Sequence, residues 1–591
     1  MARLRQRIVY ALTWVGCIAM FLSMPSKGQC QPLEGHVDYP TNYFDHPLHL
    51  PVTLAATFGE IRPNHFHSGL DLRIGGKIGE PIYAPADGYV SRVNISAWGG
   101  GKVLYITHPN GFRTVYMHCN DFTGEAGEFV RNYQYEHRTF TMDVELPKDS
   151  IKVRRGQLIA HAGNTGGSGG PHLHYEIRYA ANDQPINPFY FGTKYTDNIA
   201  PTIRNIKVYP ANTEARLDGQ WQAVTMKQTN KKGTTRWVDT VRVQGRFYVG
   251  VFATDAAEGS TQKNGVEMIE LYVDDSLFYR YSIPTFLFEE TRAINAIIDY
   301  DEYQRSGNYY IITRCLRGNK NVFSRAVNGQ GYLQFNDGQL HRLRYVVSDY
   351  KGNRTSRTFY VRDIPGQQPA IPADTNIDIP GEPITYYKSK TFERSGFSAF
   401  FPIGTVYEND FLSYYVRSSS GLSPHHNLSL TLFPLPPHQP FTVRLTYNAE
   451  RLQQLGCRPE QLVIVCTQGK SRTALPTRRT DEWLEGSTKS FGSFSVEADT
   501  VAPKVSPVNF ANGKYLATHL LKIKISDNLS GIASYHCYIN GVWTLAEHDG
   551  KTATLTVNAT KNLHNGTNSI RIFVTDAVGN VTDLEYHVLK S

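Results

Sequence analysis

The chain has 591 residues, enough for about four domains of ordinary size. With 40% hydrophobic and 19% charged residues, its composition excludes a multi-span membrane protein and a wholly disordered one. The formal net charge of +8 becomes +4 once four basic residues of the first 28 are set aside, which is too little to predict nucleic-acid binding. The 36 Tyr, 29 Phe, 49 Gly and 31 Pro favour strands joined by tight turns, so we expect a mainly β chain.

The first 28 residues have the pattern of an export signal. Residues 1–7 are basic, residues 8–22 are apolar, and Ser26 and Gly28 supply the small side chains of a cleavage site. The apolar run of about 15 residues is shorter than the ~20 that a membrane-spanning helix needs. We therefore expect a cleaved signal peptide, no stable membrane span, and a protein in the periplasm or cell envelope, or secreted. Cys30 leaves open a lipoprotein anchored at that residue.

The seven cysteines include no CxxC pair and have no regular spacing. The pattern favours neither a zinc knuckle nor a dense disulfide framework. Cys457 and Cys466 are the two that lie close enough in the sequence to suggest a disulfide.

An internal repeat occupies two later parts of the chain. Residues 197–201 (Asp-Asn-Ile-Ala-Pro) recur as residues 499–503 (Asp-Thr-Val-Ala-Pro), and alternating apolar segments follow each copy. The two copies also end in the same way. Residues 343–353 and residues 570–580 each contain an apolar strand, an Asp and a Gly-Asn turn. Both copies are predicted to be β-sandwiches, and they are similar to the immunoglobulin-like (Ig-like) modules of bacterial surface proteins.

These observations divide the chain into five segments. An aromatic insertion at residues 279–310 enlarges the first sandwich, and a Pro-rich linker at residues 365–383 precedes a further β-rich part. The predicted segments are a signal peptide (1–28), a domain that carries the histidine motifs (29–195), an Ig-like sandwich with the insertion (196–365), a β-rich domain with its linker (366–497) and a C-terminal Ig-like sandwich (498–591).

The candidate chemistry lies between residues 65 and 176. His67 and Asp71 form an H-x-x-x-D pattern, and His172 and His174 form an H-x-H pattern about a hundred residues later. In an extended strand the side chains at i and i+2 point to one face, so both imidazoles enter one cavity. A catalytic zinc ion takes three nitrogen or oxygen ligands and keeps one position for water. His118, on an apolar stretch, adds a third imidazole to the same part of the chain.

With these motifs, residues 54–188 resemble the lysostaphin/LytM-type zinc metallopeptidases, which cut peptides of bacterial cell walls. The matching stretches are residues 67–71, 84–90, 116–118, 163–166 and 172–176. The resemblance implies an antiparallel β-sheet metallopeptidase domain (the duplicated-hybrid-motif fold) that binds Zn²⁺ through His67, Asp71 and His174. It also implies that His118 and His172 act as catalytic base or transition-state stabiliser, and that the partner is the peptide part of peptidoglycan.

Several assignments stay open at the level of sequence. The pattern does not say which of His118 and His172 is the general base. His65 and His67 also form an H-x-H pattern, so His65 is an alternative metal ligand. Glu176 either orients a ligand or points inward for packing, and His161 is interpreted as a surface histidine.

Two further expectations concern the surroundings of the site. Residues 119–151 are longer and more charged than the family pattern, and we expect them to form a wall or lid beside the cleft. Because the motifs end near Pro188 and the repeat begins near Asp197, we expect residues 29–195 to fold alone.

The sequence thus predicts an exported zinc endopeptidase that acts on peptidoglycan stem peptides or cross-links. Two alternatives remain: a catalytically inactive LytM-like protein that binds the wall and activates another hydrolase, and a surface adhesin or scaffold whose β-domains do the work. The sequence makes no prediction of oligomeric state.

Overall fold

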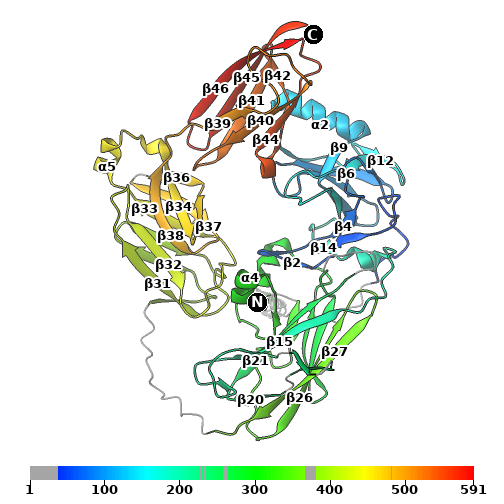
Figure 1. The fold of residues 1–591 in the computed structure, drawn as a ribbon, viewed down its shortest axis with the longest axis vertical. Coiled ribbons are helices and arrows are strands. Elements are labelled where there is room, and N and C mark those ends of the chain that lie inside the picture. Colours follow the sequence, from blue (N-terminus) through cyan, green and yellow to red (C-terminus); the bar gives the residue numbers. More distant parts are fainter. Residues whose placement is uncertain are drawn as a thin grey trace, which may run out of the picture. The chain divides into compact units, whose positions relative to one another are not determined.

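The computed structural model describes residues 38–226, 228–231, 234–237, 240–256, 264–320, 323–366, 381–480 and 482–591. The predicted signal peptide (1–28) and Cys30 lie outside these residues. Nearly all strand pairs are antiparallel, and the strands form several sheets along the chain (Figure 1). The prediction of a mainly β chain with several β-sheet regions is therefore confirmed. The Ig-like assignment of two of these regions stays a prediction.

The first region, residues 39–195, contains a nine-stranded sheet in which strands pair in the order β1-β4-β13-β8-β7-β6-β10, with β11 beside β6 and β14 beside β13. A three-stranded sheet (β5-β12-β9) and the small β2-β3 hairpin complete it. Its elements are β1 (Leu54–Ala56), β2 (Ile61–Arg62), β3 (His65–Phe66), β4 (Leu70–Arg73), β5 (Pro81–Tyr83), β6 (Gly88–Ile95), β7 (Lys102–Thr107), β8 (Phe112–Met117), β9 (Cys119–Phe122), α2 (Gly124–His137), β10 (Met142–Glu145), β11 (Lys152–Val153), β12 (Leu158–Ala162), β13 (His172–Tyr179), β14 (Pro185–Ile186) and the 3₁₀ helix η1 (Pro188–Phe191).

The two faces of the nine-stranded sheet differ in chemistry. Leu173, Tyr175 and Ile177 of β13 point into the main hydrophobic core of the region, together with Leu70 and Leu72 of β4. Because side chains alternate along a strand, the residues between them point to the opposite face. That opposite face carries the polar side chains of both strands.

The second region, residues 196–366, has a four-stranded sheet (β17-β15-β21-β24) and a seven-stranded sheet (β16-β20-β27-β26-β22-β23-β25) that share one core. The predicted aromatic insertion (279–310) supplies the second half of β23 and three short helices. Its elements are β15 (Thr202–Pro210), β16 (Arg216–Leu217), β17 (Val224–Thr225), β18 (Gln228–Lys231), β19 (Thr234–Trp237), β20 (Thr240–Gln244), β21 (Phe247–Thr254), β22 (Met268–Val273), β23 (Ser276–Ser282), η2 (Phe288–Ala293), α3 (Ile294–Ile297), α4 (Tyr300–Ser306), β24 (Ile311–Ile312), β25 (Ser324–Ala326), β26 (Leu340–Ser348) and β27 (Arg354–Asp363).

The third region, residues 381–498, packs a six-stranded sheet (β28-β31-β32-β38-β34-β35) and a five-stranded sheet (β29-β30-β33-β37-β36) around a common core. Its elements are β28 (Glu382–Ile384), β29 (Lys390–Arg394), β30 (Phe397–Phe401), β31 (Asp410–Arg417), β32 (His425–Leu430), β33 (Phe441–Thr446), α5 (Ala449–Gln454), η3 (Pro459–Gln461), β34 (Leu462–Gln468), β35 (Ser471–Ala474), β36 (Thr477–Thr480), β37 (Trp483–Thr488) and β38 (Gly492–Ala498).

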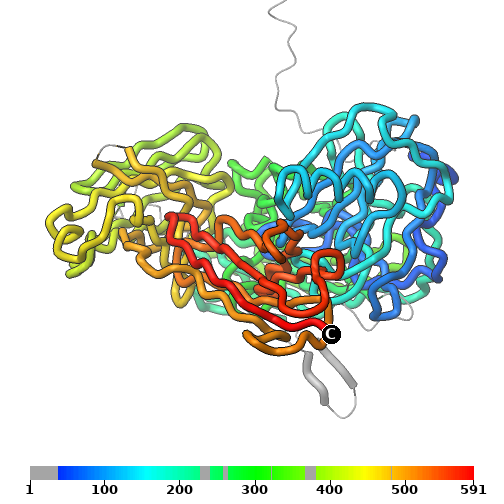
Figure 2. Tube along the Cα trace, turned by 90° about the horizontal axis from the view of Figure 1, so that it is seen from above, coloured from blue at the N-terminus to red at the C-terminus, as the bar shows by residue number. Residues whose placement is uncertain are grey.

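The fourth region, residues 499–591, has two four-stranded sheets around one core, β39-β40-β44-β43 and β42-β41-β45-β46. The long β45-β46 hairpin is the red pair of tubes in Figure 2. The elements are β39 (Lys504–Pro507), β40 (Leu520–Ser526), β41 (Ile532–Ile539), β42 (Val542–Thr544), β43 (Ala546–Asp549), η4 (Gly550–Thr552), β44 (Thr554–Asn558), β45 (Gly566–Asp576) and β46 (Val581–Lys590).

The suggested Cys457–Cys466 disulfide is wrong. Both cysteines are free. The Cys466 thiol is buried in the core of the third region and contacts the carbonyl oxygen of Ser490, whereas the Cys457 thiol contacts the carbonyl oxygen of Leu455. Cys466 lies within β34 and Cys457 precedes η3, so their short separation in sequence does not bring the two sulfur atoms together.

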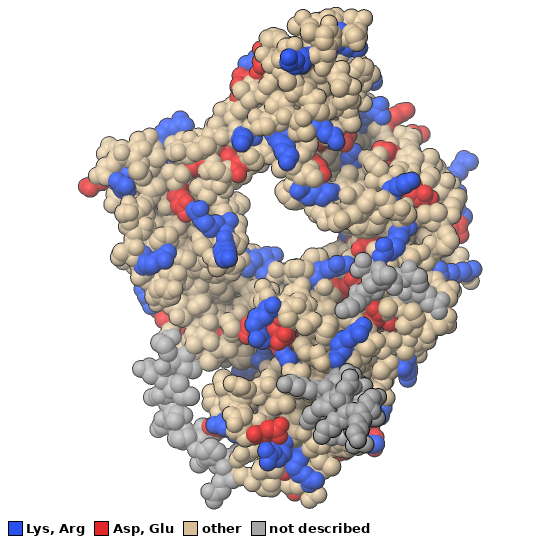
Figure 3. All heavy atoms as spheres, viewed as in Figure 1, with Lys and Arg blue, Asp and Glu red and all other residues tan. Residues whose placement is uncertain are grey.

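The surface agrees with the modest net charge. On the face shown in Figure 3, basic and acidic side chains are interspersed over a largely uncharged surface. Among the residues that the structure describes, no helix is long and apolar enough to cross a membrane.

The β2-β3 hairpin of the first region packs into the core of the second region. Phe58 and Phe66, each 1% exposed, belong to the cluster formed by the second region's strands. The Tyr350 hydroxyl also donates a hydrogen bond to the carbonyl oxygen of Phe58 (3.0 Å). The two regions therefore share a core at the place where His67 follows β3.

This shared core predicts that residues 29–195 alone are less stable than residues 29–365. The shorter fragment exposes Phe58 and Phe66, and burying each such side chain contributes about 1.5–3 kcal/mol. We expect a lower midpoint of urea unfolding for the shorter fragment, measured by tyrosine and tryptophan fluorescence on both proteins. Equal stability of the two fragments would contradict this and restore the expectation from sequence.

Candidate metal centre

The register of the central strands builds the site. β13 lies between β4 and β8, and its pairing with β4 sets His174 directly opposite Asp71. Residues directly opposite each other in an antiparallel pair point to the same face. Both side chains therefore lie on the polar face of the sheet, where His172 also points because it is two residues from His174.

Three ligand atoms from three places in the sequence meet on this face. His67 Nε2 lies 2.9 Å from Asp71 Oδ1 and 3.0 Å from His174 Nδ1. His174 Nδ1 is 2.8 Å from the same Asp71 oxygen. All three side chains are buried, with 6–9% of each residue exposed.

Hydrogen bonds on the far side of each ring fix which nitrogen faces the centre. His67 Nδ1 donates to the carbonyl oxygen of Thr57 (2.7 Å), which can only accept. His174 Nε2 donates to Glu176 Oε1 (2.8 Å). When the rings are neutral, His67 Nε2 and His174 Nδ1 thus present lone pairs toward the centre, as metal-bound histidines do when their other nitrogen is hydrogen-bonded.

Glu176 is a fully buried, ionised carboxylate. Burial raises its pKa, but the Arg178 guanidinium and His174 outweigh this and lower the pKa to about 2. Arg178 Nε donates to Glu176 Oε2, and the Ser68 hydroxyl donates to Oε1 at 2.5 Å. Of the two roles left open for Glu176, the structure favours orientation of His174.

The centre attracts positive charge. Burial lowers the pKa of His174, yet Asp71 and Glu176 raise it to about 9. Burial also raises the pKa of Asp71, but the neighbouring histidines hold it well below its usual range. At mutual distances of 2.8–3.0 Å, two imidazole nitrogens and one carboxylate oxygen can share either a ring proton or a bound metal cation. This donor set of two nitrogens and one oxygen fits a zinc ion with a position left for water.

His118 and His172 border this centre. His172 Nδ1 donates to the carbonyl oxygen of Gly170 (2.8 Å), and its Nε2 lies 3.4 Å from Asp71 Oδ1. His118 Nδ1 donates to the carbonyl oxygen of Thr165 (2.8 Å). The centres of the His118 and His172 rings are 4.8 Å apart.

The backbone of His118 explains its direction. Met117 is paired with His174, so regular alternation would turn the next side chain to the other face of the sheet. His118 instead has φ of +63°, a left-handed conformation that is rare for a residue with a side chain. Burial and the charges of His174 and His172 lower the pKa of His118 to about 3, so its ring is neutral at pH 7.

Two other histidines lie outside the centre. His65 is exposed, and its Nδ1 bonds to the carbonyl oxygen of Pro63 (2.9 Å). It does not belong to the group of ligand atoms formed by His67, Asp71 and His174. His161 is partly exposed and lies 2.6 Å from Asp121 Oδ1.

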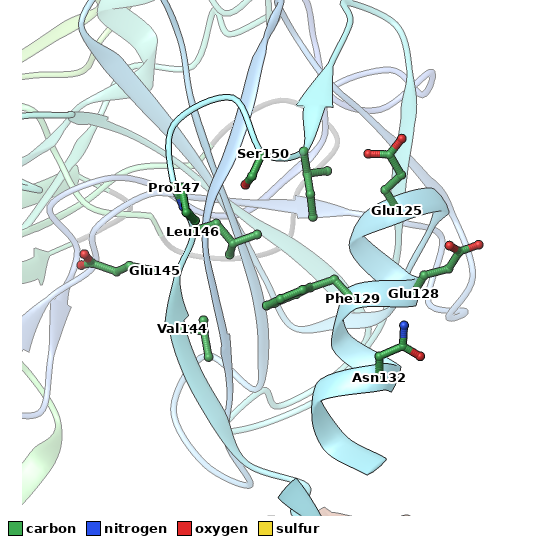
Figure 4. Close-up of a pocket in the computed structure, with 10 residues that line it drawn as sticks. Glu125, Glu128, Phe129, Asn132, Val144, Glu145, Leu146, Pro147 and Ser150 are labelled. Carbon is green, nitrogen blue, oxygen red and sulfur yellow. The ribbon is translucent and has the colours of Figure 1, made fainter. Parts of the chain in front are cut away.

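Part of the segment expected as a wall or lid lines a pocket; its position beside a substrate cleft stays a prediction. Phe129 of α2 points toward Val144 and Leu146, and Glu125 and Glu128 lie along the same helix (Figure 4). This pocket has a volume of about 430 Å³, and none of the five predicted site residues lines it.

The sequence did not reveal the support from the second region. The Thr291 hydroxyl accepts a hydrogen bond from the backbone N–H of Phe66 (2.8 Å), and Asn295 Nδ2 donates to Asn64 Oδ1 (3.0 Å). The Phe288 ring covers the guanidinium of Arg178 at 4.6 Å. Because these partners are more than a hundred residues away and form no motif, only the folded chain shows them.

The comparisons with known proteins match two parts of the chain. The model of peptidase family M23 matches residues 65–135 and 132–188, and that of the Zu5-like domain matches residues 382–499. An uncharacterized metalloprotease of Haemophilus influenzae is 35% identical over 130 residues, 22% of this chain and 21% of the relative. The DD-carboxypeptidase/endopeptidase Mpg of Neisseria meningitidis is 34% identical over 122 residues, 21% of this chain and 22% of that protein.

Among solved structures, the catalytic domain of a mutant of the prophage-encoded M23 protein EnpA from Enterococcus faecalis is 25% identical. The match covers 26% of this chain and 98% of that chain, with a TM-score of 0.19. This chain spans about a fifth of the length of the curated relatives named above. The match of residues 65–188 to the family model shows that the chain contains a peptidase M23 domain, and the candidate metal centre lies within it.

Gly69 is a sensitive position beside the metal centre. A Cβ atom there would lie 2.3 Å from the carbonyl oxygen of Tyr175 and 3.0 Å from His174 Nε2. We predict that Gly69→Ala displaces β13 and lowers zinc affinity at least about tenfold, as loss of a ligand-orienting contact does. Zinc competition with a chromogenic chelator measures this.

Gly169→Ala is the matched control, because a Cβ atom at Gly169 would meet nothing within 4 Å. We expect its zinc affinity to equal that of the parent protein. Equal zinc affinity of Gly69→Ala and the parent would contradict the prediction.

Proposed function

We propose that this protein is an exported zinc metalloendopeptidase that hydrolyses peptide bonds of peptidoglycan stem peptides or cross-links. In this proposal His67, Asp71 and His174 are the zinc ligands, and His118 and His172 are the catalytic side chains. The observation that carries it is the convergence of three buried ligand atoms with two further imidazoles on one face of the sheet.

The chemistry follows from the donor set and the two flanking rings. When bound, Zn²⁺ supplies a water whose pKa is lowered to about 7 and polarises the scissile carbonyl. In each of His118 and His172, Nδ1 donates to a backbone carbonyl, so Nε2 carries the lone pair when the ring is neutral. One ring can accept the proton of the attacking water, and the other can stabilise the developing oxyanion.

Peptidoglycan is the substrate that the relatives suggest. Mpg of Neisseria meningitidis is named a DD-carboxypeptidase/endopeptidase, and ShyA of Vibrio cholerae is named a peptidoglycan DD-endopeptidase. The similarity covers 21% of this chain for Mpg and 20% for ShyA. Export to the envelope, which the first 28 residues predict, would bring the enzyme to this substrate.

The direct test uses zinc-loaded full-length protein and purified sacculi. After muramidase digestion of the treated sacculi, we expect fewer cross-linked muropeptides or shorter stem peptides, with loss of this activity on chelation and recovery on addition of zinc. Mass spectrometry of the products identifies the bond that is cut. Binding to sacculi without cleavage of their peptides would contradict the proposal and favour the inactive activator or the adhesin.

A second prediction separates a ligand from a catalytic side chain within one tripeptide. His174→Ala removes one of three protein ligands, so its zinc content should fall. His172→Ala should keep its zinc and lose about 10²–10⁴ in kcat. Metal analysis and peptide hydrolysis on the purified variants measure both effects.

His65→Ala is the control, since His65 is an exposed histidine of the neighbouring H-x-H pattern. It should keep both zinc and activity. Equal zinc loss in His172→Ala and His174→Ala, or full activity in either, would contradict the assignment.

A further inference from the structure

The second region contains a group of three buried carboxylates. Asp197 precedes β15, Asp255 directly follows β21 and Asp349 directly follows β26. One oxygen of each carboxylate lies within 4.8 Å of the other two. The residues are 7%, 6% and 1% exposed. Two of them are the aspartates at which the repeat identified in the sequence begins and closes.

The fourth region builds the same group from corresponding positions. Asp499 precedes β39, Asp527 directly follows β40, and Asp576 ends β45. Their ligand oxygens also lie within 4.8 Å of one another. β15 and β39 are the first strands of the two copies, and β26 and β45 are the strands that lead to the last aspartate of each copy. The same arrangement of three carboxylates therefore occurs in both copies.

The two groups are held by matching hydrogen bonds. In the second region, Asp349 Oδ1 accepts from the backbone N–H groups of Lys351 and Asn353, and the Asn353 amide donates to Asp349 Oδ2. The Asn353 amide also donates to the carbonyl oxygen of Asp197 (3.2 Å). These bonds fix the Asp349 carboxylate and the backbone of Asp197 relative to each other.

The fourth region repeats these bonds. Asp576 Oδ1 accepts from the N–H groups of Val578 and Asn580, and the Asn580 amide donates to Asp576 Oδ2. Asn580 also donates to the carbonyl oxygen of Asp499 (3.0 Å). In both copies, the Asn of the Gly-Asn turn therefore donates hydrogen bonds to the last aspartate and to the backbone of the first.

A buried amide without partners gives independent evidence at the first group. Asn264 pairs with Asp255 through two backbone hydrogen bonds, so the two side chains lie side by side on one face. Asn264 is 1% exposed, yet neither its Oδ1 nor its Nδ2 has a hydrogen-bond partner. Asp255 Oδ1 is likewise buried without a partner. Buried polar atoms are normally hydrogen-bonded, so these atoms are available to bind a water molecule or an ion.

The pKa of Asp255 also indicates crowded negative charge at the first group. Burial is the main cause that raises the pKa of Asp255 to about 7; the N–H of Ala256 lowers it, and Asp197 and Asp349 raise it further. In the fourth region, Asp527 Oδ1 and Ser530 Oγ are also buried atoms without a partner. Both groups thus combine crowded negative charge with oxygen atoms that lack a bonding partner.

From these observations we propose that each of the two carboxylate groups binds a Ca²⁺ ion. Calcium takes six to eight oxygen ligands at about 2.3–2.6 Å, so two oxygens that share one ion are separated by no more than about 5 Å. Each group supplies three carboxylates within that limit. Asn264 Oδ1 in the second region and Ser530 Oγ in the fourth are further oxygen ligands. An all-oxygen donor set favours such a hard cation over zinc.

The positions of the groups indicate what the ions do. Asp197 and Asp499 lie where the chain enters the second and fourth regions, and each is tied to the ends of two strands of its own region. A bound ion would hold the entering segment to those strands. Because the unfolded chain lacks the group, binding stabilises the folded region.

The first measurement uses calcium alone on the full-length protein after treatment with EGTA. Equilibrium dialysis against ⁴⁵Ca²⁺ should show about two saturable sites per chain, with dissociation constants near the 10⁻⁴–10⁻³ M that is typical of extracellular modules. The temperature of unfolding should rise with calcium. Absence of saturable binding up to about 10 mM calcium would overturn the proposal.

Isosteric variants locate the sites. Asp255→Asn and Asp527→Asn should each lose one ion, and the double variant should lose both. Without calcium, Asp255→Asn should melt no lower than the parent, because it removes a buried like charge; with calcium it should melt lower. Asp583→Asn, which changes an exposed carboxylate paired with Arg571, is the control and should keep two ions.

His174→Ala should also keep two calcium ions, which separates these sites from the zinc centre. Two calcium ions bound by the double variant would overturn the proposal.

Discussion

The antiparallel register between β4 and β13 is the constraint on which the metal centre depends. It sets Asp71 opposite His174 and turns both to the polar face, while the leucines of β4 enter the core behind them. A slip of one residue would exchange the two faces of β13 and bury the histidines among apolar side chains. The hydrophobic core thus fixes the geometry of the site, because it makes every other register costly.

The site also depends on several buried charged groups that compensate one another. Glu176 is fully buried and is compensated by Arg178 and by the ring proton of His174. The Phe288 ring of the second region covers the guanidinium. In such surroundings removal of one partner leaves an uncompensated charge, whereas the complete set holds His174 in one orientation. The second region therefore contributes to the metal centre without supplying any of its five predicted residues.

The two carboxylate groups of the second and fourth regions are also buried charges that need compensation. Like charges gathered away from water are unfavourable unless a cation or a proton compensates them. That the chain builds the group twice, with the same hydrogen bonds to the Gly-Asn turn, indicates a shared structural requirement. Calcium at both places would link the region entry to the strand ends, independently of the metal in the catalytic region.

The sequence by itself determined the mainly β class, the M23 motifs and the placement of His172 and His174 on one face, because strand alternation is a local property. It also revealed the repeat. It could not reveal that the repeat's aspartates meet, because Asp197 and Asp349 are far apart in the chain, or that Asp255, which lies outside both motifs, joins them.

Tertiary structure alone decided the rest. The positive φ of His118 turns its ring toward the centre, against the alternation of its strand. The carbonyl oxygen of Thr57 fixes the ring nitrogen that His67 presents. Phe66 and its partner Thr291 join two regions that the sequence had separated. These features arise from contacts between residues far apart in the chain, and no short-range pattern in a single sequence records them.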